Sequence, residues 1–172
     1  MNRYSTAFTL FELLITIAIL GVLLGIGVPS FGSLIERNQQ TTTTHDLLTA
    51  LSYARTLAIN RREHISLCAG ADNCEASANW GKDILIFSDP NRNGQLDDDE
   101  HLHRIVPIPG RNHWNWSNFR SRAFMSFKPN GTTDSLNGTY TLCSGSEALR
   151  QIVINITGRL RTRSPEDNSA CN

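Results

Sequence analysis

The feature that most constrains this chain is an apolar stretch over residues 8–28, in which the only charged residue is Glu12. A helix of that length spans roughly 31 Å, which is enough to cross the apolar core of a bilayer. Only seven residues precede the stretch, and the small residue Ala7 lies before it, whereas the cleavage site of a secretory signal follows its apolar run. A charge inside lipid costs at least about 2.5 kcal/mol, so we expect Glu12 to have a partner. The sequence therefore predicts a transmembrane helix that carries a functional acid.

The residues around the start of this stretch, Ala-Phe-Thr-Leu-Phe-Glu at positions 7–12, resemble the prepilin processing motif. The resemblance implies that residues 1–7 are a leader, which a membrane prepilin peptidase removes by cutting between Ala7 and Phe8. Phe8 would then become the N-methylated first residue, and the amino terminus of a neighbouring subunit would be the partner of Glu12. Glycine is usual before the cut, so Ala7 predicts slower processing. A plain signal anchor with an isolated glutamate is the alternative interpretation.

The helical pattern continues beyond the apolar stretch, over residues 29–60. Leu47, Leu51, Ala54 and Ala58 recur at the three-and-four spacing of one apolar helix face. Pro29 lies where pilins commonly carry a helix-kinking proline, and the resemblance implies a bend there. We therefore expect an amphipathic spine helix that continues the membrane segment.

After residue 60 the pattern changes to short strands separated by Gly, Asn, Asp and Pro clusters. A hydrophobic content of 40% and a charged content of 19% are typical of a packed core and exclude general disorder. The expected strands are Ile65–Cys68, Ile84–Phe87, His103–Ile108, Phe124–Phe127, Thr139–Cys143 and Ile152–Ile156. The predicted fold is α+β and pilin-like, with one long N-terminal helix and a small antiparallel β-rich head over residues 61–172. Residues 108–122 match no pattern that we recognise.

The head extends the resemblance along nearly the whole chain. The resemblance in the head rests on five short motifs. They are Leu-Cys at 67–68 with Cys74, Trp-Gly at 80–81, Ile-Phe-Ser-Asp at 86–89, Asn-Gly at 93–94, and Gly-Arg at 158–159. Together they resemble the GspH/FimT family of minor pilins and pseudopilins of type IV pili and type II secretion. The resemblance implies a subunit with pilins as partners.

Four cysteines lie on what would be the exported side, where disulfides persist, and their even number allows three pairings. We favour a local Cys68–Cys74 bridge and a Cys143–Cys171 bridge. The second would hold the polar tail over residues 164–172, which has almost no apolar residue to anchor it. A zinc site is the alternative, but no pair of cysteines has the Cys-x2-Cys spacing.

Residues 89–100 match the spacing of a calcium loop, with oxygen ligands expected from Asp89, Asn91, Asn93, Asp97 and Glu100. A strand precedes this loop instead of a helix, and a solvated acidic turn that reverses a hairpin is the interpretation that we favour. We expect no other cofactor.

No catalytic arrangement emerges from the sequence. His101 and His103 would lie on one face of a strand, but two ligands do not make a metal site. There is no Ser/His/Asp order, no phosphate-binding glycine loop and no cysteine free to act as a nucleophile. We expect no enzymatic activity.

The sequence Gly-Arg-Leu-Arg-Thr-Arg at 158–163 is the most informative polar motif. In an extended strand, Arg159, Arg161 and Arg163 would share one face at intervals of about 6.6 Å, which suits successive phosphates. The motif of Gly158 and these arginines also resembles the DNA-contacting motif of minor pilins used in natural transformation. A charged edge strand that resists aggregation is the alternative interpretation. Arg120, Arg122, Lys128 and Arg150 would widen the basic patch. Trp114 and Trp116 would either stack on bases or fill the core, and we favour the core.

Charge is distributed unevenly along the chain. Lysine plus arginine number 16, as do aspartate plus glutamate, which excludes a wholly basic nucleic-acid coat. Residues 101–172 nevertheless carry 9 basic and 4 acidic side chains, so a local basic patch is available. We therefore expect an N-methylated minor pilin of a type IV pilus, with a role in assembly and in sequence-independent capture of double-stranded DNA.

Two other functions fit the same residues, namely a type II secretion pseudopilin and a purely structural subunit that primes the pilus. In every case we expect a single pass through the bacterial inner membrane, with the head in the periplasm. The subunit would then move into the filament, near its tip.

Overall fold

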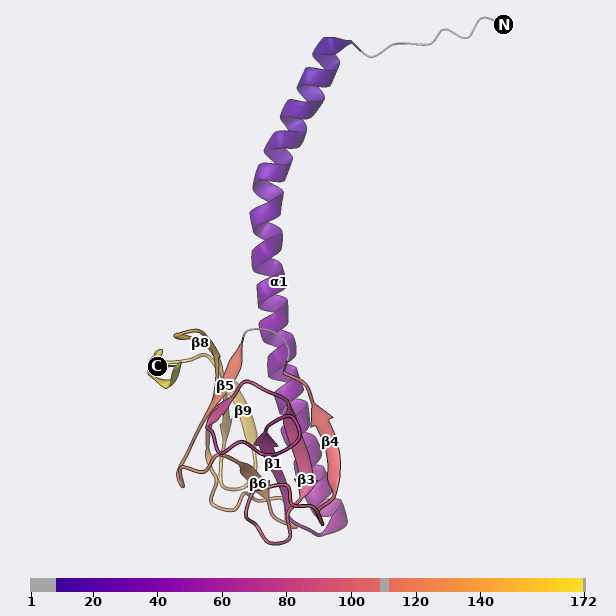
Figure 1. Cartoon of the computed structure of the whole chain (residues 1–172). Coiled ribbons are helices and arrows are strands. Elements are labelled where there is room, and N and C mark those ends of the chain that lie inside the picture. Colours follow the sequence, from indigo (N-terminus) through magenta and orange to yellow (C-terminus); the bar gives the residue numbers. More distant parts are fainter. Residues whose placement is uncertain (1–8, 109–111, 172) are drawn as a thin grey trace, which may run out of the picture. The chain divides into compact units, whose positions relative to one another are not determined.

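The computed structural model describes residues 9–108 and 112–171, except for the side chains of residues 26–30, 33 and 169 (Figure 1). Within these residues it contains α1 (Leu10–Arg61), β1 (Ile65–Ala69), β2 (Asn79–Trp80), β3 (Ile84–Ser88), β4 (Leu102–Val106), β5 (His113–Asn118), β6 (Met125–Phe127), β7 (Gly138–Ser144), β8 (Glu147–Ile154), β9 (Leu160–Arg163) and the short helix η1 (Ser169–Cys171). Residues 1–39 and 40–172 form two separate compact units.

The first unit contains the start of α1, where Thr9 acts as the N-cap. The Glu12 amide donates to Thr9 Oγ1 at 3.2 Å, and the Leu13 amide donates to the Thr9 carbonyl at 3.2 Å. Glu12 occupies the third helical position, where its negative charge is favourable to the helix dipole. Its side chain is exposed and has no partner among the described residues. Thr9 and Glu12 therefore have the spacing of a capping box.

Three sequence predictions about the N-terminal region lie wholly or partly outside the described residues. The leader over residues 1–7 and the cleavage site between Ala7 and Phe8 are outside them. Pro29 falls within the range of α1, but its side chain is not described, so the bend stays a prediction. Among the described residues, no helix has the length and apolar character that a membrane crossing requires.

In the second unit, the last five turns or so of α1 supply one wall of the core. Leu47, Leu51, Ala54 and Ala58 are buried, as the predicted apolar face requires. Ala50 is buried beside them, and its small side chain, like those of Ala54 and Ala58, allows close packing. The core of the head therefore includes the end of the helix.

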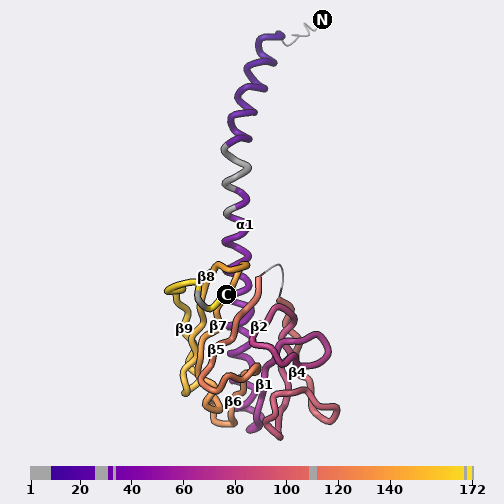
Figure 2. The backbone as a smooth tube through the Cα atoms, turned by 60° about the vertical axis from the view of Figure 1, so that its left-hand side comes forward, coloured from indigo at the N-terminus to yellow at the C-terminus, as the bar shows by residue number. Residues whose placement is uncertain are grey.

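Two antiparallel sheets complete the second unit (Figure 2). The four-stranded sheet has the order β4-β3-β1-β6, and the five-stranded sheet has the order β2-β5-β7-β8-β9. β1, β3 and β6 are buried almost throughout, whereas β9 is an exposed edge strand. The predicted α+β fold is confirmed, and each of the six predicted strands corresponds to an observed one with ends shifted by a few residues.

A cluster of aromatic rings fills the core on the inner side of the five-stranded sheet. Trp116 stacks on Tyr140 with ring centroids 4.0 Å apart, and Trp80 meets Tyr140 edge-on at 4.9 Å. Trp80 Nε1 donates to the Ala123 carbonyl at 2.9 Å. Trp114 and Trp116 are buried in this cluster, as the sequence analysis expected, and they belong to β5, a strand that it missed.

Candidate functional site

The Gly-Arg motif forms the tight turn between β8 and β9. Asn155 holds the turn, because its Oδ1 accepts the Arg159 amide at 2.8 Å and its carbonyl accepts the Gly158 amide at 2.9 Å. Gly158 has a φ of +75°, which favours glycine. A Cβ at this position would also lie 2.3 Å from the carbonyl oxygen of Gly131. Gly158 therefore shapes the turn that presents the arginines, and its role here is structural.

An arginine on α1, which the sequence analysis did not single out, supports this turn. Arg55 Nε donates to the Gly131 carbonyl at 2.9 Å, and Arg55 Nη2 donates to the Thr157 carbonyl at 3.1 Å. One side chain thus joins the helix to two separate turns. The only sequence signal for this contact is a basic residue beside the apolar face of the helix.

Two of the three predicted arginines belong to β9, and the third lies in the turn before it. In the register of the sheet, Leu160 pairs with the buried Ile154, so Arg161 and Arg163 alternate onto the outer face, whereas Arg159 lies in the turn before β9 begins. The guanidinium groups of Arg159 and Arg161 are exposed and make no hydrogen bond or ion pair with any described residue.

Arg163 is already engaged. Its Nε donates to Gln151 Oε1 at 2.8 Å, and its Nη1 donates to Glu166 Oε1 at 2.8 Å. Only two arginines of the motif are therefore available to an anion. The edge position of β9 also fits the alternative interpretation, in which charge protects an exposed strand.

Two of the four further basic residues lie at the same end of the sheet as the Gly-Arg turn. Arg120 and Arg122 follow β5, whose last residue, Asn118, pairs with Gly138 at the start of β7. Lys128 is held by Asp134 at 3.2 Å. Arg150 pairs in register with Leu142, toward the opposite end of the strands.

The tail over residues 164–171 crosses the outer face of the five-stranded sheet at this opposite end. Cys143 on β7 is bonded to Cys171, with 5.7 Å between the Cα atoms. Asn168 Oδ1 accepts the Ala148 amide at 3.0 Å, and Asn115 Nδ2 donates to the Ala170 carbonyl. Cys68 is bonded to Cys74, so both disulfides have the pairing that the sequence analysis favoured.

The acidic loop over residues 89–100 is organised by a buried aspartate. Asp89 is fully buried, and its carboxylate accepts hydrogen bonds from Ser66 Oγ at 2.5 Å, from the Asn93 amide at 3.1 Å and from the Gly94 amide at 3.1 Å. These bonds explain the acid that follows β3. The Asp89 carboxylate stabilises the loop by accepting hydrogen bonds from the loop's own amides and from Ser66 on β1.

The other predicted calcium ligands bind one another. Asn91 and Asn93 both donate through Nδ2 to Asp97 Oδ2 at 2.8 Å, and the Asp97 amide donates to Glu100 Oε2 at 3.2 Å. Burial, followed by the charges of Asp89, Asp97 and Asp99, raises the pKa of Glu100. Among the described residues, no three acidic, histidine or cysteine side chains are grouped to hold a metal. The arrangement is that of a solvated acidic turn, and calcium binding stays a prediction.

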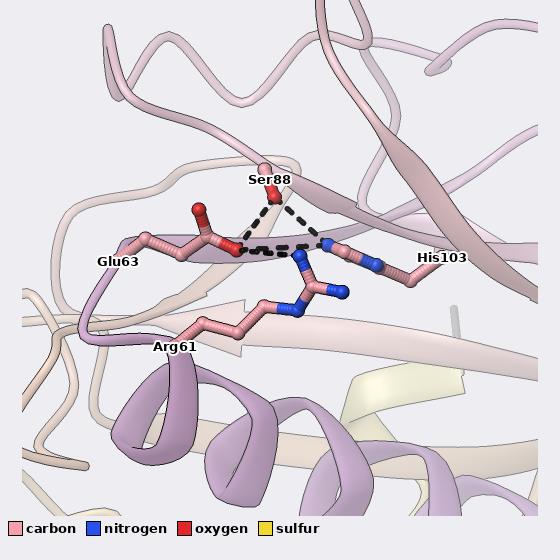
Figure 3. A network of polar contacts seen from close by, with 4 residues as sticks. All are labelled: Arg61, Glu63, Ser88 and His103. Atoms are coloured by element: carbon pink, nitrogen blue, oxygen red, sulfur yellow. Dashed lines mark hydrogen bonds and ion pairs between the residues drawn. The ribbon is translucent and has the colours of Figure 1, made fainter.

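A Ser/His/Glu cluster, which the sequence order did not indicate, lies where α1 leads into β1 (Figure 3). Ser88 Oγ donates to Glu63 Oε1 at 3.0 Å and lies 2.8 Å from His103 Nε2, so it accepts the Nε2 proton. A catalytic serine instead gives its proton to the histidine, and the acid binds the other ring nitrogen. The cluster therefore lacks the geometry of a nucleophile and acts as a polar tie between β3, β4 and the end of α1. His101 and His103 lie together, with ring centroids 4.5 Å apart.

Comparisons with known proteins agree with this geometry. The family model described as "Type II transport protein GspH" matches residues 43–158, and the model described as "Prokaryotic N-terminal methylation motif" matches residues 2–28. A crystal structure of the type IV minor pilin FimU from Pseudomonas aeruginosa is 22% identical, covers 77% of this chain and 97% of its own, and has a TM-score of 0.57. A second crystal form of FimU is 21% identical, covers 74% of this chain and 98% of its own, and has a TM-score of 0.56. No curated protein matches.

The buried histidine of the Ser/His/Glu cluster generates a prediction about pH. Burial, then the charges of Arg61 and His101, lowers the pKa of His103, whose side chain is 4% exposed, against an opposing effect of Glu63. The folded protein therefore binds this proton less well than the unfolded chain. The neutral imidazole of His103 therefore contributes fully to stability above a pH of about 6.5, the pKa in the unfolded chain. This contribution is lost as the pH falls through the lower pKa of the folded protein.

We expect the free energy of unfolding of residues 40–172 to fall by at most about 1.4 kcal/mol per pH unit for this proton, and His103→Gln to remove that slope. Urea melts at several pH values measure this slope in the native protein and in His103→Gln. The pKa of His64 is also lowered, first by burial, so the variant should keep a residual slope of the same sign. An unchanged slope in His103→Gln would contradict the assignment.

The tail disulfide generates a second prediction. Its loop of 28 residues predicts a loss of about 3.6 kcal/mol for the double variant Cys143→Ser/Cys171→Ser, from chain entropy. The matched control, Cys68→Ser/Cys74→Ser, opens a loop of 6 residues and should cost about 2.2 kcal/mol. Thermal melts of both variants test whether opening the longer loop causes the larger loss of stability. A larger loss in the control would show that the tail is held by its other contacts.

Proposed function

Because this chain belongs to the GspH family of minor pilins and pseudopilins, we propose that it is a minor pilin of a type IV pilus. The observation that carries the proposal is the combination of a methylation motif over residues 2–28 with a head whose fold resembles that of FimU. We propose further that it is anchored in the inner membrane with its head in the periplasm. From there it would be incorporated into the filament, near the tip.

Processing and assembly depend on the first residues of the apolar stretch. Cleavage by prepilin peptidase between Ala7 and Phe8 would place a methylated amine directly before Thr9, the residue that caps α1. Glu12 has an exposed carboxylate without a partner among the described residues, which leaves it available to the amino terminus of a neighbouring subunit. The other major and minor pilins are then partners through this helix.

We also propose that the head captures double-stranded DNA without regard to sequence. Arg161 on the outer face of β9 and Arg159 in the turn two residues before it each supply a guanidinium group that has no partner among the described residues. Phosphate contacts of this kind position a duplex but carry no information about its bases. Arg120 and Arg122 lie at the same end of the sheet and extend the positive region.

Two other functions remain as competing proposals. The edge position of β9 favours a purely structural subunit, since arginines there also prevent sheet-to-sheet association. The family description names type II transport, which favours a pseudopilin of a secretion system. Growth of pili, secretion of exported proteins and uptake of DNA in a deletion strain separate the three.

The position of Glu12 in the first turn of α1 allows a test of its role. Glutamine at this position keeps the side-chain oxygen that a capping box could use but removes the charge, whereas alanine removes both. We expect Glu12→Gln and Glu12→Ala to be cleaved normally but to be nearly absent from sheared pili. Immunoblots of the sheared fraction and of the membrane fraction measure both steps. Normal incorporation of Glu12→Gln, with a defect in Glu12→Ala alone, would show that helix capping matters and the charge does not.

The DNA proposal predicts a specific salt dependence. For residues 40–172 and a blunt duplex, Arg159→Gln and Arg161→Gln should each reduce the slope of log affinity against log salt by about 0.9. Arg163→Gln should change it less, because Gln151 and Glu166 already hold that side chain. Arg150→Gln, on the same sheet but away from the turn, is the matched control. Fluorescence anisotropy at several salt concentrations measures each slope, and binding that ignores both Arg159 and Arg161 would reject the site.

A further inference from the structure

A shallow apolar groove lies beside the two unpaired arginines. Its volume is about 580 Å³, and it is lined mostly by apolar atoms of residues that include Asn137, Gly138, Val153 and Ile156. The Ile156 side chain is 56% exposed, although its carbonyl is fixed by the amide and hydroxyl of Thr133. An exposed isoleucine on a fixed backbone is a preformed apolar surface, within the range of volumes that small ligands occupy.

The register of the sheet places the groove between a basic turn and an exposed aromatic ring. Asn118, Gly138, Ile154 and Leu160 pair in one row across β5, β7, β8 and β9. Arg159 precedes one end of this row, and Phe119 follows the other, about 14 Å away at the usual strand spacing. The Phe119 side chain is 81% exposed, and its amide donates to the carbonyl of Asn137 in the groove lining at 3.1 Å.

The charges around the groove favour an anionic occupant. Arg161 pairs in register with Val153 of the groove lining, so its guanidinium group leaves β9 beside the apolar surface. The charges of Asp134 and Glu166 are each balanced by another residue, since Asp134 binds Lys128 and Glu166 binds Arg163. A ligand that fits must therefore carry negative charge next to an apolar or aromatic body.

We infer that the groove takes an unpaired nucleobase of a DNA strand whose phosphates lie on Arg159 and Arg161. In a blunt duplex the bases are stacked inside and only sugars and phosphates reach the protein, so the groove gains little. A free strand can turn a base outward onto apolar and aromatic surface, and such contacts tolerate any sequence. This inference rests on the proposed capture of DNA, and it adds that a single-stranded end is the preferred part of the ligand.

Fluorescence anisotropy of residues 40–172, a compact unit with its own core, tests the inference with three labelled probes. The probes are a short oligothymidine strand, a blunt duplex of the same length, and that duplex with a single-stranded overhang. We expect the strand and the overhang to bind at least about fivefold more tightly than the blunt duplex. Ile156→Ser and Phe119→Ala should remove this preference and leave binding of the blunt duplex unchanged.

Controls separate the groove from the arginines. Ile105→Ser is the matched variant, because Ile105 is 46% exposed but lies on β4 of the other sheet, and it should keep the preference. Arg159→Gln with Arg161→Gln should weaken all three probes alike.

Equal affinity for the three probes, or a preference that survives Ile156→Ser, would overturn the inference and leave DNA capture standing. Absence of salt-dependent binding to any probe would overturn both. A third outcome would assign the groove to a contact between subunits instead. In that case the three probes bind equally, and the head self-associates in sedimentation unless Ile156→Ser is present.

Discussion

Burial of one face of α1 is the constraint on which the head depends. The face is built largely from Leu47, Leu51 and three alanines, and it joins the side chains of both sheets in a single core. The four-stranded sheet would not have a complete interior without it, because β1 and β3 are buried on both faces. The end of the helix is therefore part of the head, because the residues of α1 from 40 onward belong to the same compact unit as both sheets.

The same helix determines the geometry of the candidate site through Arg55. Its two hydrogen bonds reach turns that are 76 and 102 residues away in sequence, and both acceptors lie on or next to glycines with positive φ. The bonds fix the β8–β9 turn against the helix, so Arg159 and Arg161 project from a rigid support. An arginine used in this way cannot also contact a ligand, which divides the basic residues of the head into structural and available groups. Arg163 and Lys128 belong to the structural group with Arg55.

Much of the fold could be predicted from the sequence because its signals are local. The apolar face of the helix, six of the strands and the two disulfides follow from spacing and from the poverty of apolar residues in the tail. β5 was missed because His, Asn and Ser surround its two tryptophans, and these residues are uncommon in strands. The alternation of Trp114 and Trp116 was the signal that could have identified it.

The availability of the arginines could not be predicted in the same way. One partner of Arg163 is Glu166, which lies in the tail, and the Cys143–Cys171 bridge holds the end of that tail on the sheet. The pairing of Lys128 with Asp134 likewise depends on the closure of a turn. Sequence alternation gives the face on which a side chain lies, whereas the contacts of its charged end depend on tertiary structure.

The tail also makes the two ends of the outer face of the five-stranded sheet different. It covers the end near Cys143, and the opposite end near Gly138 stays open, about 17 Å away along β7 at the usual rise per residue. A long ligand such as a polymer strand can therefore lie across the open end or extend away from the sheet, but it cannot run the length of the strands. The two ends of this face therefore differ, because the tail occupies the end near Cys143 and the arginines lie near the other end.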